Sequence, residues 1–78
     1  MKKMTCRQLG GACDLEFQAE TFDEMETLSK NHGMEMFKKG DKPHLDAMHK
    51  MKALIQTPEE MKQWFESKRK EFDQLPHH

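Results

Sequence analysis

Residues 5–14 read TCRQLGGACD, and this stretch contains both cysteines of the 78-residue chain. The Gly-Gly pair at residues 10–11 lies between the cysteines and is a signal for a two-residue β-hairpin turn. After the turn, residues 13–20 alternate apolar and polar side chains, which is typical of a half-buried strand. A shorter and weaker alternation over residues 3–7 precedes the turn. The stretch therefore predicts an N-terminal hairpin with Cys6 on one strand and Cys13 on the other.

The position of the turn decides how the two cysteines lie relative to each other. With Gly10-Gly11 as the turn, Cys6 pairs with Leu15, and Cys6 and Cys13 become diagonal neighbours on one face, within reach of a shared metal ion. If the turn slips to Leu9-Gly10, the cysteines lie directly opposite each other and a disulfide becomes possible. The alternation favours the first register.

Three helices are predicted after the hairpin, and each has a recognisable start. Residues 21–24 (TFDE) form a capping box for the first helix, which is expected to end at Gly40. Asp41 is the candidate N-cap of the second helix. Residues 57–60 (TPEE) combine an N-cap, a proline at the first helical position and a second capping box, and Pro76 ends this third helix. His77 and His78 would form a tail.

Each predicted helix carries one apolar stripe. The stripes are Phe22, Met25, Leu28, His32 and Met36 in the first helix; His44, Met48, Met51 and Ile55, with Leu45 beside them, in the second; and Met61, Trp64, Phe65, Phe72 and Leu75 in the third. An isolated hairpin is unstable in water, so its apolar face, with Cys13, Leu15 and Phe17, must be covered, and the first helix is the nearest candidate. The sequence thus predicts an α+β fold, a β-hairpin packed on a three-helix segment, as one small domain over residues 1–78.

Length and composition favour a fold that needs a crosslink or a metal. A chain this short buries only about 60% of the surface that its unfolded form exposes. Apolar residues make up 35% of the sequence and charged residues another 35%, so the core will be thin and a structural metal would add stability. The formal net charge of −1 gives no general bias toward nucleic acids or anionic membranes.

The first residues and the hydropathy predict a cytoplasmic location. Residues 1–4 (MKKM) run into polar residues rather than into a signal-peptide core, and no apolar stretch approaches the roughly 18 residues of a membrane span. In the cytosol thiols stay reduced, and a cysteine pair there is more often metal-binding or catalytic than a disulfide. We therefore expect neither a membrane nor a nucleic acid as partner.

Candidate metal ligands occur on several of the predicted elements. Structural zinc sites have about four ligands, usually thiolate and imidazole, in tetrahedral geometry. Cys6 and Cys13 supply two thiolates from the hairpin, and His32 lies on the helix face that must cover them. The C-x6-C spacing is not a standard zinc-knuckle pattern. The predicted metal is zinc, with copper and iron as less favoured alternatives.

The fourth ligand is a choice between His44, His49, a carboxylate such as Glu35, and water. His44 lies on the apolar stripe of the second helix, whereas His49 lies to one side. In a regular antiparallel helix pair turning near residues 40–41, however, position 49 comes level with position 32. We give the face argument more weight and predict His44.

Simpler interpretations of the same residues compete with a metal site. A lone histidine on an apolar stripe is more often a hydrogen-bonded core residue than a ligand, and two cysteines on a strand are often small buried hydrophobes. The joint occurrence of both cysteines and an inward histidine in so small a chain favours metal. Thioethers suit Cu(I), but core packing is the preferred role for the methionines at helical spacing, which are Met25, Met36, Met48, Met51 and Met61.

Three classes of function remain open. The first is a structural zinc domain without enzymatic activity, since no Ser-His-Asp arrangement, phosphate-binding glycine loop or carboxylate pair is recognisable. The second is a thiol redox or metal-trafficking protein that uses Cys6 and Cys13, which requires a lowered thiol pKa and an exposed sulfur. The third is a protein-interaction module on a metal-bound scaffold, with a basic surface formed by Lys62, Lys68, Arg69 and Lys70.

The residues around the cysteines also resemble a known family. Residues 4–14 (MTCRQLGGACD), with residues 32–36 (HGMEM) and the Gly40-Asp41 pair that leads to His44, are similar to a bacterial family of unknown function described as predicted small metal-binding proteins. The resemblance covers nearly the whole chain, and its most specific part is the CRQLGG-CD segment. It implies that Cys6, Cys13, His32 and His44 bind a metal. Many members place a second histidine where this chain has Phe37. The family carries no established activity.

Overall fold

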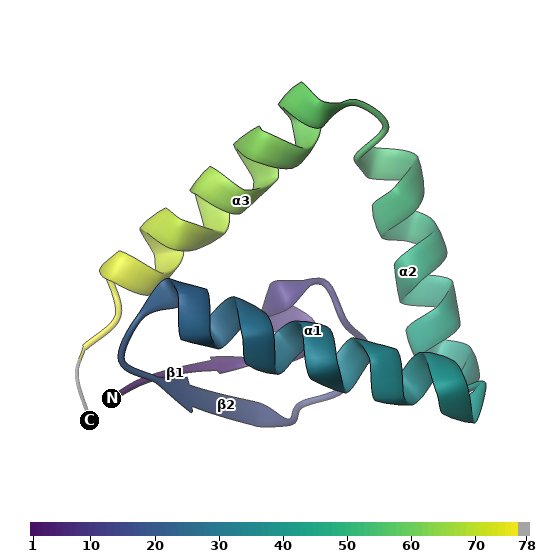
Figure 1. The fold of residues 1–78 in the computed structure, drawn as a ribbon, viewed down its shortest axis with the longest axis horizontal. Helices are drawn as coiled ribbons and strands as arrows, with labels where there is room; N and C mark the ends of the chain where they lie inside the picture. The colour runs from purple at the N-terminus through teal and green to yellow at the C-terminus, as the bar shows by residue number, and fades with distance from the viewer. Residues whose placement is uncertain (77–78) are drawn as a thin grey trace.

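The computed structural model describes residues 1–76 and contains a two-stranded antiparallel hairpin followed by three helices (Figure 1). The elements are β1 (Lys2–Thr5), the 3-10 turn η1 (Arg7–Leu9), β2 (Glu16–Ala19), α1 (Phe22–Lys39), α2 (Lys42–Leu54) and α3 (Pro58–Asp73). This confirms the predicted α+β fold. The tail predicted at His77 and His78 lies outside the described residues. Within residues 1–76, no helix combines the length and apolar character that crossing a bilayer requires.

The register of the hairpin is the predicted one. Met4 lies opposite Phe17 and Thr5 opposite Glu16. The Cys6 backbone N–H donates to the Leu15 carbonyl at 2.8 Å, so Cys6 continues the same pairing beyond the end of β1.

The predicted two-residue turn is wrong, and the strand predicted over residues 13–20 begins only at residue 16. The chain instead folds into η1, in which the Cys6 carbonyl accepts bonds from the backbone N–H groups of Leu9 at 3.1 Å and Gly11 at 2.8 Å. The Arg7 N–H donates to the Cys13 carbonyl at 2.9 Å. The carbonyl groups of Cys6 and Cys13 therefore accept hydrogen bonds within the connection itself. These local bonds replace the regular ladder between two strands.

The helices begin at the predicted caps. The Thr21 hydroxyl accepts from the Glu24 N–H at 3.2 Å, and the Thr57 hydroxyl accepts from the Glu60 N–H at 3.1 Å. The Asp41 carboxylate caps α2 in the same way. Gly40 ends α1 in the left-handed conformation, with φ of 70°, which glycine adopts without steric cost. These four positions fix where the chain turns between its helices.

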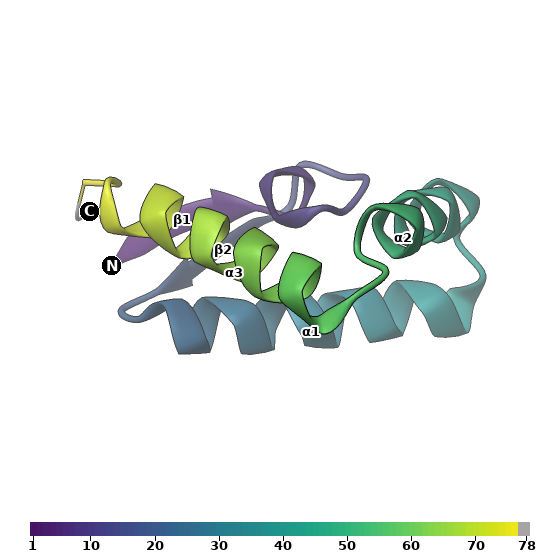
Figure 2. The same ribbon diagram turned by 90° about the horizontal axis from the view of Figure 1, so that it is seen from above.

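The three helices form an open, roughly triangular arrangement, and the hairpin lies along the side that α1 forms (Figure 1). α1 lies along one face of the hairpin, α2 leaves the far end of α1, and α3 returns toward the end where β1 begins. In Figure 2 α2 is seen nearly end-on while α1 lies across the view, so the two helices cross rather than run antiparallel. This crossing places one side of α2, with His44 in its first turn and Met51 near its end, beside the hairpin connection.

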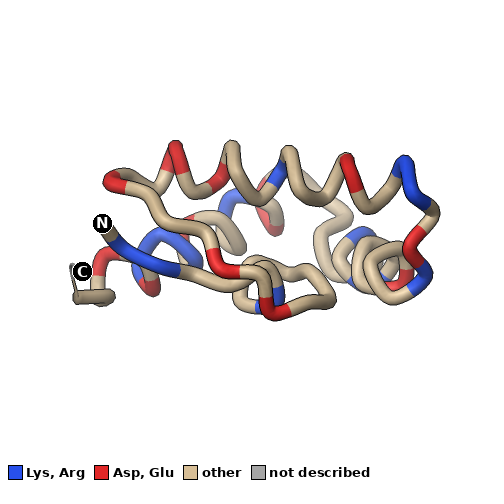
Figure 3. The backbone as a smooth tube through the Cα atoms, turned by 90° about the horizontal axis from the view of Figure 1, so that it is seen from below, with Lys and Arg blue, Asp and Glu red and all other residues tan. Residues whose placement is uncertain are grey.

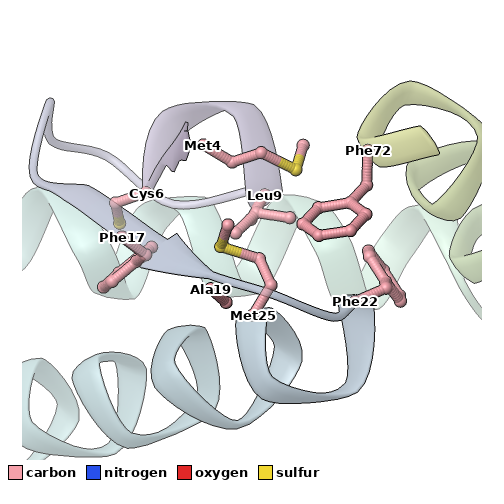
Figure 4. Packing of buried hydrophobic residues seen from close by; sticks show 8 residues of the cluster. All are labelled: Met4, Cys6, Leu9, Phe17, Ala19, Phe22, Met25 and Phe72. Atoms are coloured by element: carbon pink, nitrogen blue, oxygen red, sulfur yellow. The ribbon is translucent and has the colours of Figure 1, made fainter. Parts of the chain in front are cut away.

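The core lies between the hairpin, α1 and the last turns of α3 (Figure 4). Its buried members are Met4, Cys6, Leu9, Phe17, Ala19, Phe22, Met25 and Phe72. Met25 is fully buried, and the rings of Phe22 and Phe72 meet edge to face at 5.8 Å. α1 thus covers the hairpin as predicted, and α3 joins the core through its C-terminal half.

Three residues predicted on apolar stripes are exposed instead. Leu15 is 49% exposed because it precedes β2, in the irregular connection where strand alternation no longer sets the side-chain direction. Met61 is 48% exposed because it lies in the first turns of α3, away from the hairpin (Figure 1). Leu28, at 39%, lies at the edge of the buried face of α1. The predicted core role of Met61 is therefore wrong.

Candidate metal centre

Two thiols and two imidazoles converge where the hairpin connection, α1 and α2 meet. One donor atom from each of Cys6, Cys13, His32 and His44 lies within 4.8 Å of all the others. Cys6 Sγ is 3.6 Å from His44 Nε2, and Cys13 Sγ is 3.3 Å from His32 Nε2. Tetrahedral zinc with bonds of about 2.3 Å to sulfur and 2.0–2.1 Å to nitrogen requires S···N separations of roughly 3.5 Å. The spacing of the donors therefore fits such an ion.

The four side chains come from three separate parts of the chain. Cys6 follows β1 and is buried, and Cys13 lies half-buried in the connection before β2. His32 lies in the middle of α1, and its ring contacts the Phe17 ring edge to face at 5.7 Å. His44 lies in the first turn of α2, only 7% exposed. A shared ion would tie the hairpin to both helices.

Gly11 makes room for the Cys6 sulfur. A Cβ at position 11 would lie only 2.1 Å from Cys6 Sγ, which is too close for a real contact, and 3.0 Å from the Cys6 carbonyl oxygen, which is a tight one. Its neighbour Gly10 has a φ of 92°, which L side chains rarely adopt. The sequence analysis treated this pair only as a turn. The structure shows that Gly11 also shapes the site.

Asp41 holds the His44 ring. Its Oδ2 atom lies 2.5 Å from His44 Nδ1 and also accepts from the His44 backbone N–H at 3.2 Å. When Nδ1 carries the proton, Nε2 is left free to face Cys6 Sγ, which is the usual carboxylate–histidine–metal arrangement. The hydrogen bond that the His44 ring donates to the Asp41 carboxylate raises the pKa of His44, and the same bond lowers the pKa of Asp41.

The sequence analysis identified Asp41 only as a helix cap. The signal for its second role was present, because an N-cap aspartate three residues before a histidine places its carboxylate beside that ring.

The two thiols differ in acidity. Burial raises the pKa of the Cys6 thiol above its ordinary value. Burial also acts to raise the pKa of Cys13, but the Leu15 backbone N–H and hydrogen bonds with His44 and Cys6 outweigh it and bring this pKa below its ordinary value. Both thiols are free, so no disulfide joins them. The lowered pKa and the partial exposure of Cys13 therefore favour its thiolate over that of Cys6.

The other ligand candidates lie outside the cluster. His49 is exposed on α2, and Glu35 forms an exposed ion pair with Lys39 at 3.5 Å. The crossing of α1 and α2 (Figure 2) accounts for this result, because it brings the His44 side of α2, and not the His49 side, to the cysteines. The structure therefore brings His44 to the thiols and leaves His49 in solvent.

Comparison of the chain with protein-family models, with curated proteins and with solved structures finds no match in any of the three. The functional argument therefore depends on the geometry of this cluster and on its donor chemistry.

Proposed function

We propose that this protein is a small domain that binds one structural zinc ion through Cys6, Cys13, His32 and His44. The observation that carries the proposal is the convergence of the four donor atoms within 4.8 Å. Two thiolates and two imidazoles in tetrahedral spacing form one of the standard ligand sets of structural zinc, and this set favours zinc over copper or iron.

A structural role follows from the number of protein ligands. Catalytic zinc sites keep a coordination position open for water or substrate, whereas here four side chains fill a four-coordinate shell. We therefore propose that the protein is not an enzyme. The same four residues are the ligands implied by the resemblance to the bacterial predicted small metal-binding proteins. We propose in addition that the chain belongs to that family and that it is located in the cytoplasm.

The zinc content of ligand variants tests the proposal. Protein purified under reducing conditions should carry one zinc ion by native mass spectrometry. Tight zinc binding should be abolished in each of the variants Cys6→Ser, Cys13→Ser and His32→Ala. Each should also lower the free energy of unfolding by roughly several kcal/mol, because the free energy of zinc binding contributes to folding. His44→Ala should weaken binding less, since water can fill the vacated position.

His49→Ala is the matched control, because this exposed histidine lies on the same helix as His44. It should keep full zinc content. Loss of zinc in His49→Ala with retention in His44→Ala would contradict the ligand assignment. A wild-type protein that folds fully and binds no metal would overturn the proposed function.

A second candidate function is metal trafficking or thiol redox exchange, and the lowered pKa and partial exposure of Cys13 favour it. The buried Cys6, whose pKa is raised, argues against it. Iodoacetamide labelling of the zinc-loaded protein at neutral pH separates the two functions. Structural zinc should protect both thiols for hours, whereas rapid modification of Cys13 would favour exchange.

A further inference from the structure

An apolar groove opens to solvent where α1 and α2 diverge. It encloses about 530 Å³, and its lining residues are Lys30, Gly33, Met34, Phe37 and Lys38 from α1 and Met48 from α2. The contact across it is close, since a Cβ added at Gly33 would lie 3.9 Å from Met48 Cε. We call this surface the α1/α2 groove. None of its lining residues is one of the four candidate metal ligands.

Two large apolar side chains of the groove are mostly exposed to solvent. Phe37 is 62% exposed and Met34 is 52% exposed. Single exposed apolar residues need no explanation, but an aromatic ring and two methionines around one hollow form a contiguous patch. Methionine is also the side chain that adapts best to different partners, and such patches often bind the apolar stripe of an amphipathic helix.

The charges around the groove are basic. Lys30, Met34 and Lys38 follow one another at intervals of four, so they form a single ridge of α1 with a lysine at each end. The two lysines are about 12 Å apart along the helix axis, at about 1.5 Å per residue. Neither forms an ion pair with any residue in the described range 1–76, whereas the neighbouring Lys39 pairs with Glu35. An apolar ligand flanked by carboxylates would complement this surface.

We propose that the α1/α2 groove docks an acidic amphipathic helix of a partner protein, with its apolar stripe on Phe37, Met34 and Met48 and its carboxylates on Lys30 and Lys38. This function goes beyond zinc binding. It is also distinct from the basic surface predicted on α3, which stays a prediction and in which Lys68 pairs with Glu71 and Arg69 with Asp23 within the chain.

The surroundings of the groove disfavour other occupants. Figure 3 shows acidic positions between the basic ones along α1, so this helix presents no continuous basic face to an anionic membrane. A second copy of the chain would need roughly 800 Å² of buried surface per partner, and a hollow lined by three large apolar side chains is small for that.

Selection from a phage-displayed library of random 16-residue peptides tests the proposal. Zinc-loaded wild-type protein is the target, and Phe37→Ala protein is used to deplete other binders. Phe37 is exposed, so its removal should leave the fold intact. Selected peptides should carry an apolar helical stripe flanked by Asp or Glu. A synthetic selected peptide should bind at least about tenfold more weakly to Phe37→Ala and to Lys38→Glu, which is about 1.4 kcal/mol each.

A control variant and tests of two other possible occupants, a second copy of the chain and a membrane, complete the experiment. Leu54→Ala removes an equally exposed side chain elsewhere on α2 and should leave peptide affinity unchanged. The proposal is overturned if no selected peptide depends on Phe37, or if the selected peptides are not acidic. It is also overturned if Phe37→Ala abolishes self-association in sedimentation equilibrium or binding to phosphatidylglycerol vesicles, since the groove would then serve a second copy or a membrane.

Discussion

Gly11 is the residue whose replacement tests the site with the smallest change. Gly11→Ala adds one methyl group, and that group would lie 2.1 Å from Cys6 Sγ. The methyl group has little room to shift, because the Cys6 carbonyl oxygen is only 3.0 Å from it, so the Cys6 sulfur must move. We expect a loss of about 1–3 kcal/mol in unfolding free energy, as in other overpacked sites, together with weaker zinc binding. Thermal unfolding and competition with a chromophoric chelator measure the two effects.

Gly33→Ala is the control for this prediction. Gly33 lies inside α1, and the nearest atom to an added Cβ is Met48 Cε at an ordinary 3.9 Å. Removing a glycine from a helix interior should stabilise the protein by roughly 0.5–1 kcal/mol and leave zinc affinity unchanged. If both variants behave alike, the tight packing of Gly11 against the Cys6 sulfur has no role in the site.

At the scale of single residues, the sequence allowed most of the site to be predicted. Thiols and imidazoles are few in this chain, so donor chemistry and apolar spacing single out Cys6, Cys13 and His32. The close packing of Gly11 and the second bond of Asp41 were missed, because both depend on distances of a few ångströms that spacing along the chain does not specify.

At the scale of elements, the start of α2 combines two tasks in one side chain. Asp41 caps the helix and orients His44, and Asp41→Asn separates these roles because asparagine caps helices as well as aspartate does. We expect Asp41→Asn to keep thermal stability in the metal-free state but to lower zinc affinity by about 10- to 100-fold, the usual effect of removing a ligand's hydrogen-bond partner. Asp41→Ala should lose about 1 kcal/mol of stability as well.

Asp46→Asn is the matched control, since this exposed aspartate lies on α2 away from the metal centre. Zinc titration of all three variants in one buffer gives the comparison. Wild-type affinity in Asp41→Asn would show that the carboxylate acts only as a cap.

Local chemistry also explains which elements were predictable. Helix starts depend on a side chain bonding to a backbone N–H a few residues away, and the caps at Thr21, Asp41 and Thr57 were all predicted. The hairpin turn was not, because η1 competes locally with a two-residue turn and is stabilised by bonds to the Cys6 carbonyl. The crossing of α1 and α2 depends on packing between residues far apart in the chain, such as Cys6 and His44, so the sequence left His44 and His49 as alternatives.

At the scale of the whole molecule, the candidate metal centre is the buried attachment of α2, and Met51 adds a contact with Gly10. His44 is the one buried residue of this helix, whereas α3 joins the core through Phe72 and α1 through Phe22 and Met25. A domain with so thin a core gains much of its stability from any ion that binds only the folded state. The same ion would fix the α1/α2 groove, because Met48 forms its second wall.

Removal of zinc should therefore loosen α2 before the rest of the fold. We expect chelation to speed amide hydrogen exchange most strongly in residues 42–54, while the Phe22–Phe72 contact keeps α1 and the end of α3 better protected. The metal-free protein should also bind an acidic peptide selected on the α1/α2 groove at least about tenfold more weakly, because Met48 no longer lies opposite α1. Exchange followed by mass spectrometry, with and without one equivalent of zinc, measures the first effect, and peptide fluorescence anisotropy measures the second. Uniform exchange across all three helices would show that the ion supports the whole domain equally, and unchanged exchange in α2 would show that His44 holds this helix without a metal.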